Sequence, residues 1–164
     1  MNRNGFTLVE LIIVTAIITI LLAISTIAFR DWVRRNRVES QFKTMYADLM
    51  TARSQGLYNK NRTGKSVIIT ASAFSVYSTT NTGVTPVETK VLTVPVTPAN
   101  TRIDFDQTGV ATLNSNGTVT DVAYVCVGTN TTSAIFNSLI ISNTRIQMGT
   151  VSGGVCNSAN ISPQ

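Results

Sequence analysis

The residue types that support catalysis are scarce in this sequence. Its 164 residues include no histidine, so the commonest general base and the commonest zinc ligand are both missing. Only serine–lysine or carboxylate schemes could then activate a nucleophile. Asp104 and Asp106 alternate on one predicted strand face, but an Asp-x-Asp pair is more often a solvated edge or turn feature. We therefore predict that the protein is not an enzyme and uses no metal or cofactor.

The two cysteines, Cys126 and Cys156, point to a structural role. They are too few for a four-thiolate metal site, and their spacing differs from that of the redox motif C-x-x-C. A disulfide between them would place the head in an oxidising compartment. It would close a loop of about thirty residues, worth roughly 3 to 4 kcal/mol on the chain-entropy model. Two free buried thiols are the alternative.

One carboxylate lies inside an apolar segment. Residues 6–29 are apolar apart from Glu10 and several hydroxyl residues, and as a helix they would span about 35 Å, enough to cross a bilayer core. An acid at the membrane centre costs about 3 kcal/mol, and less near an end. Glu10 therefore either reaches the headgroups or has a function. A secretory signal peptide is the alternative for the segment, but the apolar run is too long and no A-x-A site follows it.

The residues around Glu10 form a specific motif. Gly5-Phe6-Thr7-Leu8-Val9-Glu10-Leu11, after a short polar leader with one arginine, resembles the N-terminal motif of type IV prepilins and type II secretion pseudopilins. The resemblance implies that a membrane-embedded prepilin peptidase cuts between Gly5 and Phe6, and that the new amino group on Phe6 is methylated. Glycine at position 5 suits cleavage because it has no side chain to obstruct the peptidase.

The spacing within the motif has a physical reason. Cleavage leaves a cationic amine on Phe6, and Glu10, four residues later, lies on the same helix face. A lone charge in an apolar setting is strongly disfavoured, whereas a paired charge is tolerated. We predict that the amine of one subunit and the Glu10 of its neighbour recognise each other during assembly. The partners implied are other pilins or pseudopilins in a helical filament, the prepilin peptidase and an inner-membrane assembly platform.

Four segments must position these residues. We predict a leader over residues 1–5, a transmembrane and filament-core helix over 6–29, its amphipathic continuation over 30–58, and a β-rich globular head over 59–164. In the continuation, apolar residues recur at spacings of three and four, which predicts one buried face. That face comprises Val38, Phe42, Met45, Leu49 and Ala52. The residues predicted to face water are Glu39, Lys43, Asp48 and Arg53.

The head loses the helical period and gains turn signals. The predicted fold is α+β and pilin-like, with the long N-terminal helix packed on an antiparallel β-sheet head. Turns are predicted over 80–83 and 114–117, and Pro86, Pro95 and Pro98 are expected at edges or in loops. The predicted strands span 66–70, 74–77, 91–96, 102–105, 110–113, 119–127, 139–142 and 145–151.

The net charge of +5 is concentrated before the head. Residues 1–65 contain ten basic and four acidic side chains, whereas residues 66–164 contain three and four, so charge does not predict a nucleic-acid-binding head. Four arginines follow the apolar segment and one precedes it, which by the positive-inside count would place the head in the cytoplasm. The motif and the cysteines require the opposite, and these arginines can bind headgroups at the outer leaflet. We predict a single-pass protein of the bacterial inner membrane with a periplasmic head, which then joins an extracellular pilus or a periplasmic pseudopilus.

Three later segments resemble a narrower family. Residues 50–55, 102–109 and 138–145 are similar to the GspH/FimT family of minor pilins and minor pseudopilins, which implies a scarce subunit that primes or caps a filament. Some FimT-like members bind DNA in natural transformation through a C-terminal G-R-x-R motif. Here residues 144–147 read Thr-Arg-Ile-Gln, so one arginine of the pair is present. The alternative function is therefore a DNA-binding subunit at the pilus tip, with contacts from Arg145, Lys60, Arg62 and Lys65.

Overall fold

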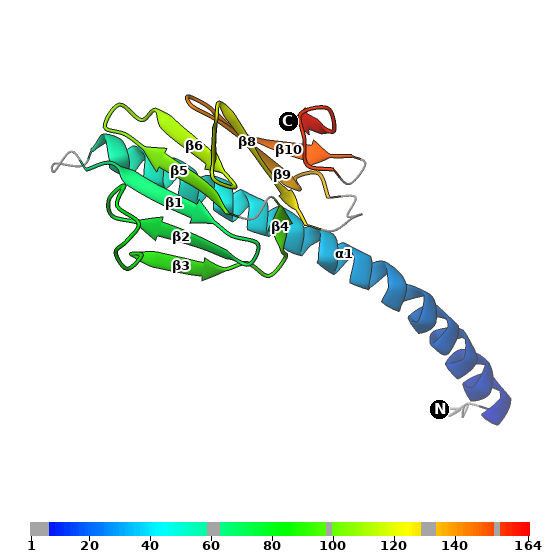
Figure 1. The fold of residues 1–164 in the computed structure, drawn as a ribbon. Helices are drawn as coiled ribbons and strands as arrows, with labels where there is room; N and C mark the ends of the chain where they lie inside the picture. The colour runs from blue at the N-terminus through cyan, green and yellow to red at the C-terminus, as the bar shows by residue number, and fades with distance from the viewer. Residues whose placement is uncertain (1–6, 59–62, 98–99, 129–133, 153–154) are drawn as a thin grey trace. The chain divides into compact units, whose positions relative to one another are not determined.

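The chain divides into two compact units, Met1–Arg34 and Arg35–Gln164. The structure, a computed structural model, describes residues 7–58, 63–97, 100–128, 134–152 and 155–164, with the backbone alone at 24–27. One helix, α1 (Leu8–Leu57), runs through both units (Figure 1). The predicted processing site at Gly5 and Phe6 lies outside the described residues, as do Lys60, Arg62 and Pro98.

The first unit presents an apolar helical surface. Its large apolar side chains between residues 8 and 22 are 46% to 74% exposed. This part of α1 is long and apolar enough to cross a membrane by its length and composition. The hydroxyls of Thr15 and Thr19 donate to the carbonyls of Ile12 and Ala16, at 3.0 and 2.8 Å. Such local bonds satisfy polar side chains inside an apolar helix.

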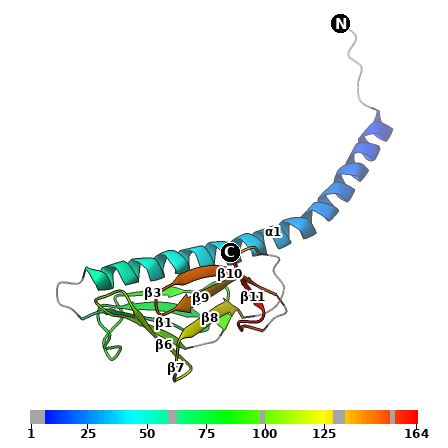
Figure 2. The ribbon, with the colours of Figure 1, turned by 90° about the horizontal axis from the view of Figure 1, so that it is seen from above.

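The second unit packs two antiparallel sheets against α1. Figure 2 shows both sheets on the same side of this part of the helix. The first sheet has the order β3-β2-β1-β5-β6-β7 and the second has the order β11-β10-β9-β8-β4. The strands of the first sheet are β1 (Lys65–Ile69), β2 (Ala73–Tyr77), β3 (Glu88–Val91), β5 (Thr101–Phe105), β6 (Ala111–Ser115) and β7 (Thr118–Thr120). Those of the second are β4 (Val96–Thr97), β8 (Val122–Val127), β9 (Ser138–Ser142), β10 (Ile146–Val151) and β11 (Ile161–Pro163).

The core confirms the predicted α+β fold with its helix packed on antiparallel strands. All five residues of the predicted helix face are buried, with exposed fractions of 0% to 2%. They belong to one cluster with inward side chains of both sheets, among them Phe74, Ile103 and Leu139. In β5 the burial alternates along the strand, the period-two pattern of a sheet with one face in a core.

Two predicted strands are wrong in the same way. The strand predicted over 91–96 is split between β3 of the first sheet and β4 of the second. Pro95, which lacks a backbone N–H, lies at this crossing. The strand predicted over 119–127 is likewise split at Asp121, between β7 and β8. An apolar run indicates that its residues are buried but does not indicate in which sheet, so the sequence pattern alone predicts one continuous strand at each crossing.

The predicted disulfide is present. Cys126 in β8 is bonded to Cys156, with a Cα–Cα distance of 5.8 Å. Cys156 lies in the segment that leads to β11, an edge strand of three residues. The covalent bond therefore adds a second constraint to the pairing of β10 with β11, which joins the C-terminal segment to the sheet at three residue pairs.

Replacing both cysteines by alanine is expected to lower the free energy of unfolding by about 3 to 4 kcal/mol, since the unfolded chain regains the freedom of a 30-residue loop. The measurement is urea unfolding of the full-length chain in mild detergent, followed by circular dichroism. A reductant should lower the wild-type midpoint to that of the variant and leave the variant unchanged. Equal midpoints for the oxidised wild type and the variant would contradict a stabilising disulfide.

Candidate functional site

Glu10 lies in the first turn of α1. The backbone N–H of Glu10 donates to the Thr7 hydroxyl at 3.3 Å, which gives α1 an N-cap of the usual kind. A carboxylate in the first turn also complements the partial positive charge of a helix N-terminus. Thr7 and Glu10 therefore both stabilise the start of α1.

The Glu10 carboxylate is surrounded by apolar surface. Leu8, Val9, Leu11 and Ile12 beside it are between 57% and 74% exposed. Within the described part of the chain, Glu10 takes part in no ion pair and its carboxylate accepts no hydrogen bond. It is also the one charged residue between Thr7 and Phe29. Chemically, the arrangement is an unpaired anion on an apolar surface, which can accept a cationic partner when that surface is covered.

All four charged residues predicted to face water contact the head. Lys43 remains exposed and lies over the Phe136 ring, and the other three form hydrogen bonds or an ion pair with head residues. Glu39 accepts a hydrogen bond from the N–H of Ile135 at 2.9 Å. Asp48 pairs with the ammonium group of Lys90 at 2.8 Å. Arg53 donates to the carbonyl of Gly109 at 2.8 Å. The prediction was wrong for these three because helical spacing identifies the apolar face but not which loops cover its borders.

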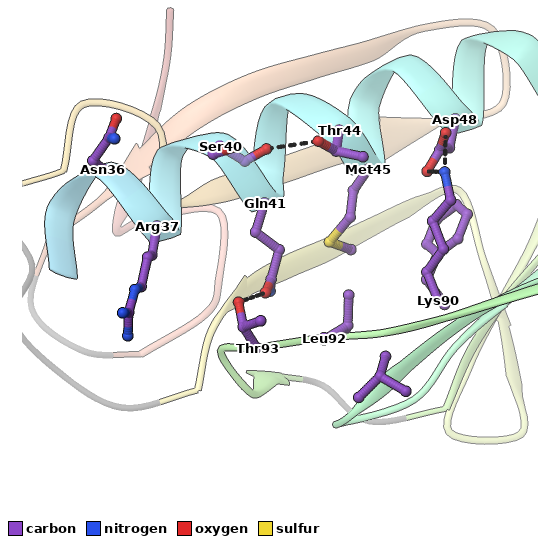
Figure 3. Close-up of a pocket in the computed structure, with 12 residues that line it drawn as sticks. Asn36, Arg37, Ser40, Gln41, Thr44, Met45, Asp48, Lys90, Leu92 and Thr93 are labelled. Carbon is purple, nitrogen blue, oxygen red and sulfur yellow. Dashed lines mark hydrogen bonds and ion pairs between the residues drawn. The ribbon is translucent and has the colours of Figure 1, made fainter. Parts of the chain in front are cut away.

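A groove lies beside this part of α1. Its volume is about 370 Å³, and it is bounded by the helix, by β3 and by the segment after β3. Met45, Phe74 and Leu92 supply apolar lining. Figure 3 shows Arg37 and the Lys90–Asp48 pair at opposite ends. Hydrogen bonding to Asp48 raises the pKa of Lys90 above its ordinary value, so this end stays an ion pair at physiological pH.

Gln41 fixes the wall of the groove. Its side-chain amide donates to the Val94 carbonyl at 2.7 Å and accepts from the Val94 N–H at 2.9 Å. The Thr93 hydroxyl donates to the same Gln41 oxygen at 3.0 Å, a bond also drawn in Figure 3. Gln41 thus holds the segment through which the chain passes from β3 to β4. Its role is not among the sequence predictions, and the only signal for it in the sequence is a polar residue bordering the apolar helix face.

The two aspartates of the Asp-x-Asp pair have separate structural roles. Asp104 lies in β5, accepts from the Arg102 guanidinium at 2.9 Å and also accepts from the Ser66 hydroxyl. Asp106 lies beyond the strand, in a turn, so the two carboxylates do not share a strand face and the turn interpretation holds for Asp106.

The Asp106 turn caps the end of β5. Hydrogen bonds from the Thr108 hydroxyl, and then from the backbone N–H groups of Val110 and Thr108, lower the pKa of Asp106. Gly109 in this turn has a φ of 75°, and a Cβ there would lie 3.0 Å from the Leu57 side chain. The Asp106 carboxylate therefore stabilises a turn that packs against the end of α1.

The two described residues among those suggested for DNA binding, Arg145 and Lys65, lie on different elements. Arg145 is exposed and lies in the turn between β9 and β10, where its N–H donates to the Ser142 hydroxyl at 3.1 Å. Lys65 begins β1, in the other sheet. Phosphate binding of useful strength needs several cations acting together, and the placement of these two described cations gives the DNA-binding alternative no support.

Comparison with known proteins identifies the N-terminal segment. Residues 1–26 match the prokaryotic N-terminal methylation motif. The match supports a type IV pilin-like protein, and hence a substrate of prepilin peptidase whose apolar helix anchors it in a membrane. No curated protein and no solved structure matches the chain.

Proposed function

We propose that the protein is a minor pilin or minor pseudopilin of the GspH/FimT kind, which primes or caps assembly of a type IV pilus or a type II secretion pseudopilus. The observation that carries the proposal is the methylation motif over residues 1–26, which includes Glu10, the one acidic residue on the exposed apolar part of α1. The similarity of residues 50–55, 102–109 and 138–145 to the GspH/FimT family supports the narrower assignment.

Assembly depends on two groups of the motif with opposite charge, the amine of Phe6 and the carboxylate of Glu10. Cleavage behind Gly5 creates a cationic amine on Phe6, and methylation keeps that amine basic. A neighbouring subunit that covers the apolar surface of α1 would bury its Glu10 carboxylate, and pairing with the incoming amine removes the cost of that burial. Before assembly the subunit is inserted in the inner membrane. Its disulfide-bonded head lies in the periplasm, where oxidised cysteines persist.

The proposed role is structural and not catalytic. The chain has no histidine, and Asp104 and Asp106 are each held by hydrogen bonds that fix a strand or a turn. The groove beside α1 is lined by the Lys90–Asp48 ion pair, the guanidinium of Arg37, amides, hydroxyls and apolar side chains. None of these described groups forms a nucleophile with an adjacent base, the arrangement that covalent catalysis requires.

The processing step is tested by mass spectrometry of the protein from its native membrane or filament. The mature chain is expected to start at an N-methylated Phe6. Gly5→Val should leave the leader attached, because a branched side chain obstructs the approach of the peptidase to the backbone. Asn4→Ala, a change beside the bond that keeps the glycine, should be processed normally. An uncut start at Met1 in the native material would overturn the proposal.

A further inference from the structure

The C-terminal end of the apolar segment carries two exposed aromatic side chains. Phe29 and Trp32 are 63% and 59% exposed, and their rings stack with centroids 6.0 Å apart. They are three residues apart on α1, so they lie on the same side of the helix. Large aromatic rings left on a surface in this way indicate a surface that is covered by something else.

Two arginines alternate with these rings. Arg30 and Arg34 are exposed, and within the described residues neither guanidinium group takes part in a hydrogen bond or an ion pair. Four residues apart, they face the same side of α1, where like charges slightly disfavour a helix unless an anion neutralises them. Asp31 lies between them in sequence and is also exposed, so the segment has a net charge of +1, the sum of two arginines and one aspartate.

The distance along the helix places this segment at a membrane surface. From Leu8 to Phe29 a helix rises about 32 Å, close to the thickness of a bilayer's hydrocarbon core of about 30 Å. Residues 29–34 then rise a further 7 to 8 Å, roughly the depth of one headgroup layer. Tryptophan is enriched at this depth because its ring is apolar and its N–H is polar. Arginine there can bind lipid phosphate.

We infer that Phe29, Arg30, Trp32 and Arg34 form an interfacial anchor that binds anionic phospholipid headgroups. The aromatic pair sits at the boundary of the acyl chains, and the two guanidinium groups bind the phosphates. The anchor fixes the depth of α1 in the bilayer and must be released when the subunit leaves the membrane. The inference rests on the proposed function in one respect, that the apolar helix is inserted in a membrane.

The single tryptophan of the chain makes the anchor measurable, because all tryptophan emission comes from Trp32. The full-length chain is reconstituted in vesicles of equal parts phosphatidylcholine and phosphatidylglycerol. Lipids brominated near the headgroup should quench Trp32 more than lipids brominated at the end of the acyl chain. At equal amounts, brominated phosphatidylglycerol should quench more than brominated phosphatidylcholine, and salt should reduce this preference.

Charge-matched variants separate the anchor from a general effect of charge. Arg34→Gln should reduce the preference for phosphatidylglycerol about fivefold, the effect of one arginine near an anionic surface. Arg30→Gln/Arg34→Gln should reduce the preference about twenty-five-fold, the effect of two such arginines. Arg145→Gln removes the same charge from an exposed turn of the head and should leave the preference unchanged.

The outcomes distinguish this inference from the proposed function. Quenching at the bilayer centre, or equal quenching by both brominated lipids, would overturn the anchor while leaving membrane insertion intact. A chain that no brominated lipid quenches, and that an alkaline wash removes from vesicles, would overturn membrane insertion and the anchor together. Stronger quenching by shallow phosphatidylglycerol, reduced in the double variant, supports the anchor.

Discussion

Glu10→Gln is expected to remain in the membrane but to be almost absent from filaments. Glutamine has nearly the size and shape of glutamate, so the apolar surface around position 10 is preserved and the negative charge alone is lost. The amine of the incoming subunit would then be buried without an anion. Removing one partner of a buried ion pair costs about 3 to 5 kcal/mol, which corresponds to a loss of over about a hundredfold in the equilibrium for incorporation.

The measurement compares the variant in sheared filament fractions and in membrane fractions of the same cells by quantitative immunoblot. Thr19→Val is the matched control, because it is a shape-preserving change on the same apolar part of α1 that alters no charge, and the Thr19 hydroxyl already donates within its own helix at 2.8 Å. Mass spectrometry of the membrane fraction must show that Glu10→Gln still begins at Phe6, so that failed processing is not mistaken for failed assembly. Normal incorporation of a processed Glu10→Gln chain would refute the pairing of amine and carboxylate.

The helix and its buried face could be predicted from the sequence because both depend on local regularity. A run of apolar residues and a repeat of three and four residues are visible within a short window, and the structure buries Val38, Phe42 and Leu49 at 0% to 1% exposure. The strand crossings at Pro95 and Asp121 could not be predicted so well. Each crossing depends on which of the two sheets the two halves of an apolar run join. The strands that pair with each half are distant in sequence, so a local pattern does not identify them.

The contacts of the charged helix residues show the same limit. Asp48 meets Lys90 across 42 residues, Arg53 meets Gly109 across 56, and Glu39 meets Ile135 across 96. No local pattern marks these pairs. β11 was missed for a related reason, since three residues are too few to show an alternation. The motif around Glu10 could be recognised because its meaning is contained in seven consecutive residues.

Phe42→Ala is expected to lower the free energy of unfolding of the head by about 3 to 5 kcal/mol. Phe42 is 0% exposed and belongs to the cluster formed by α1 and both sheets. Truncation removes the largest side chain of the buried helix face and leaves a cavity that helix and sheets cannot close without moving together. Most small domains have a total stability of only about 5 to 15 kcal/mol, so the loss is a large share of what holds the head folded.

Urea unfolding of the full-length variant in detergent, followed by the circular dichroism of its strands, measures this loss. Thr51→Ala on the exposed side of the same helix is the control, because its hydroxyl bonds only the carbonyl of Ala47 at 2.8 Å, and it should change stability by about 0.5 kcal/mol or less. Phe42→Leu should fall between the two. A loss near that of Thr51→Ala would show that this face of α1 does not build the core. A loss of about 3 to 5 kcal/mol, in a chain that is still cleaved between Gly5 and Phe6, would show that Phe42 stabilises the head without affecting processing. The part of α1 that builds the core and the part that is processed would then depend on different residues.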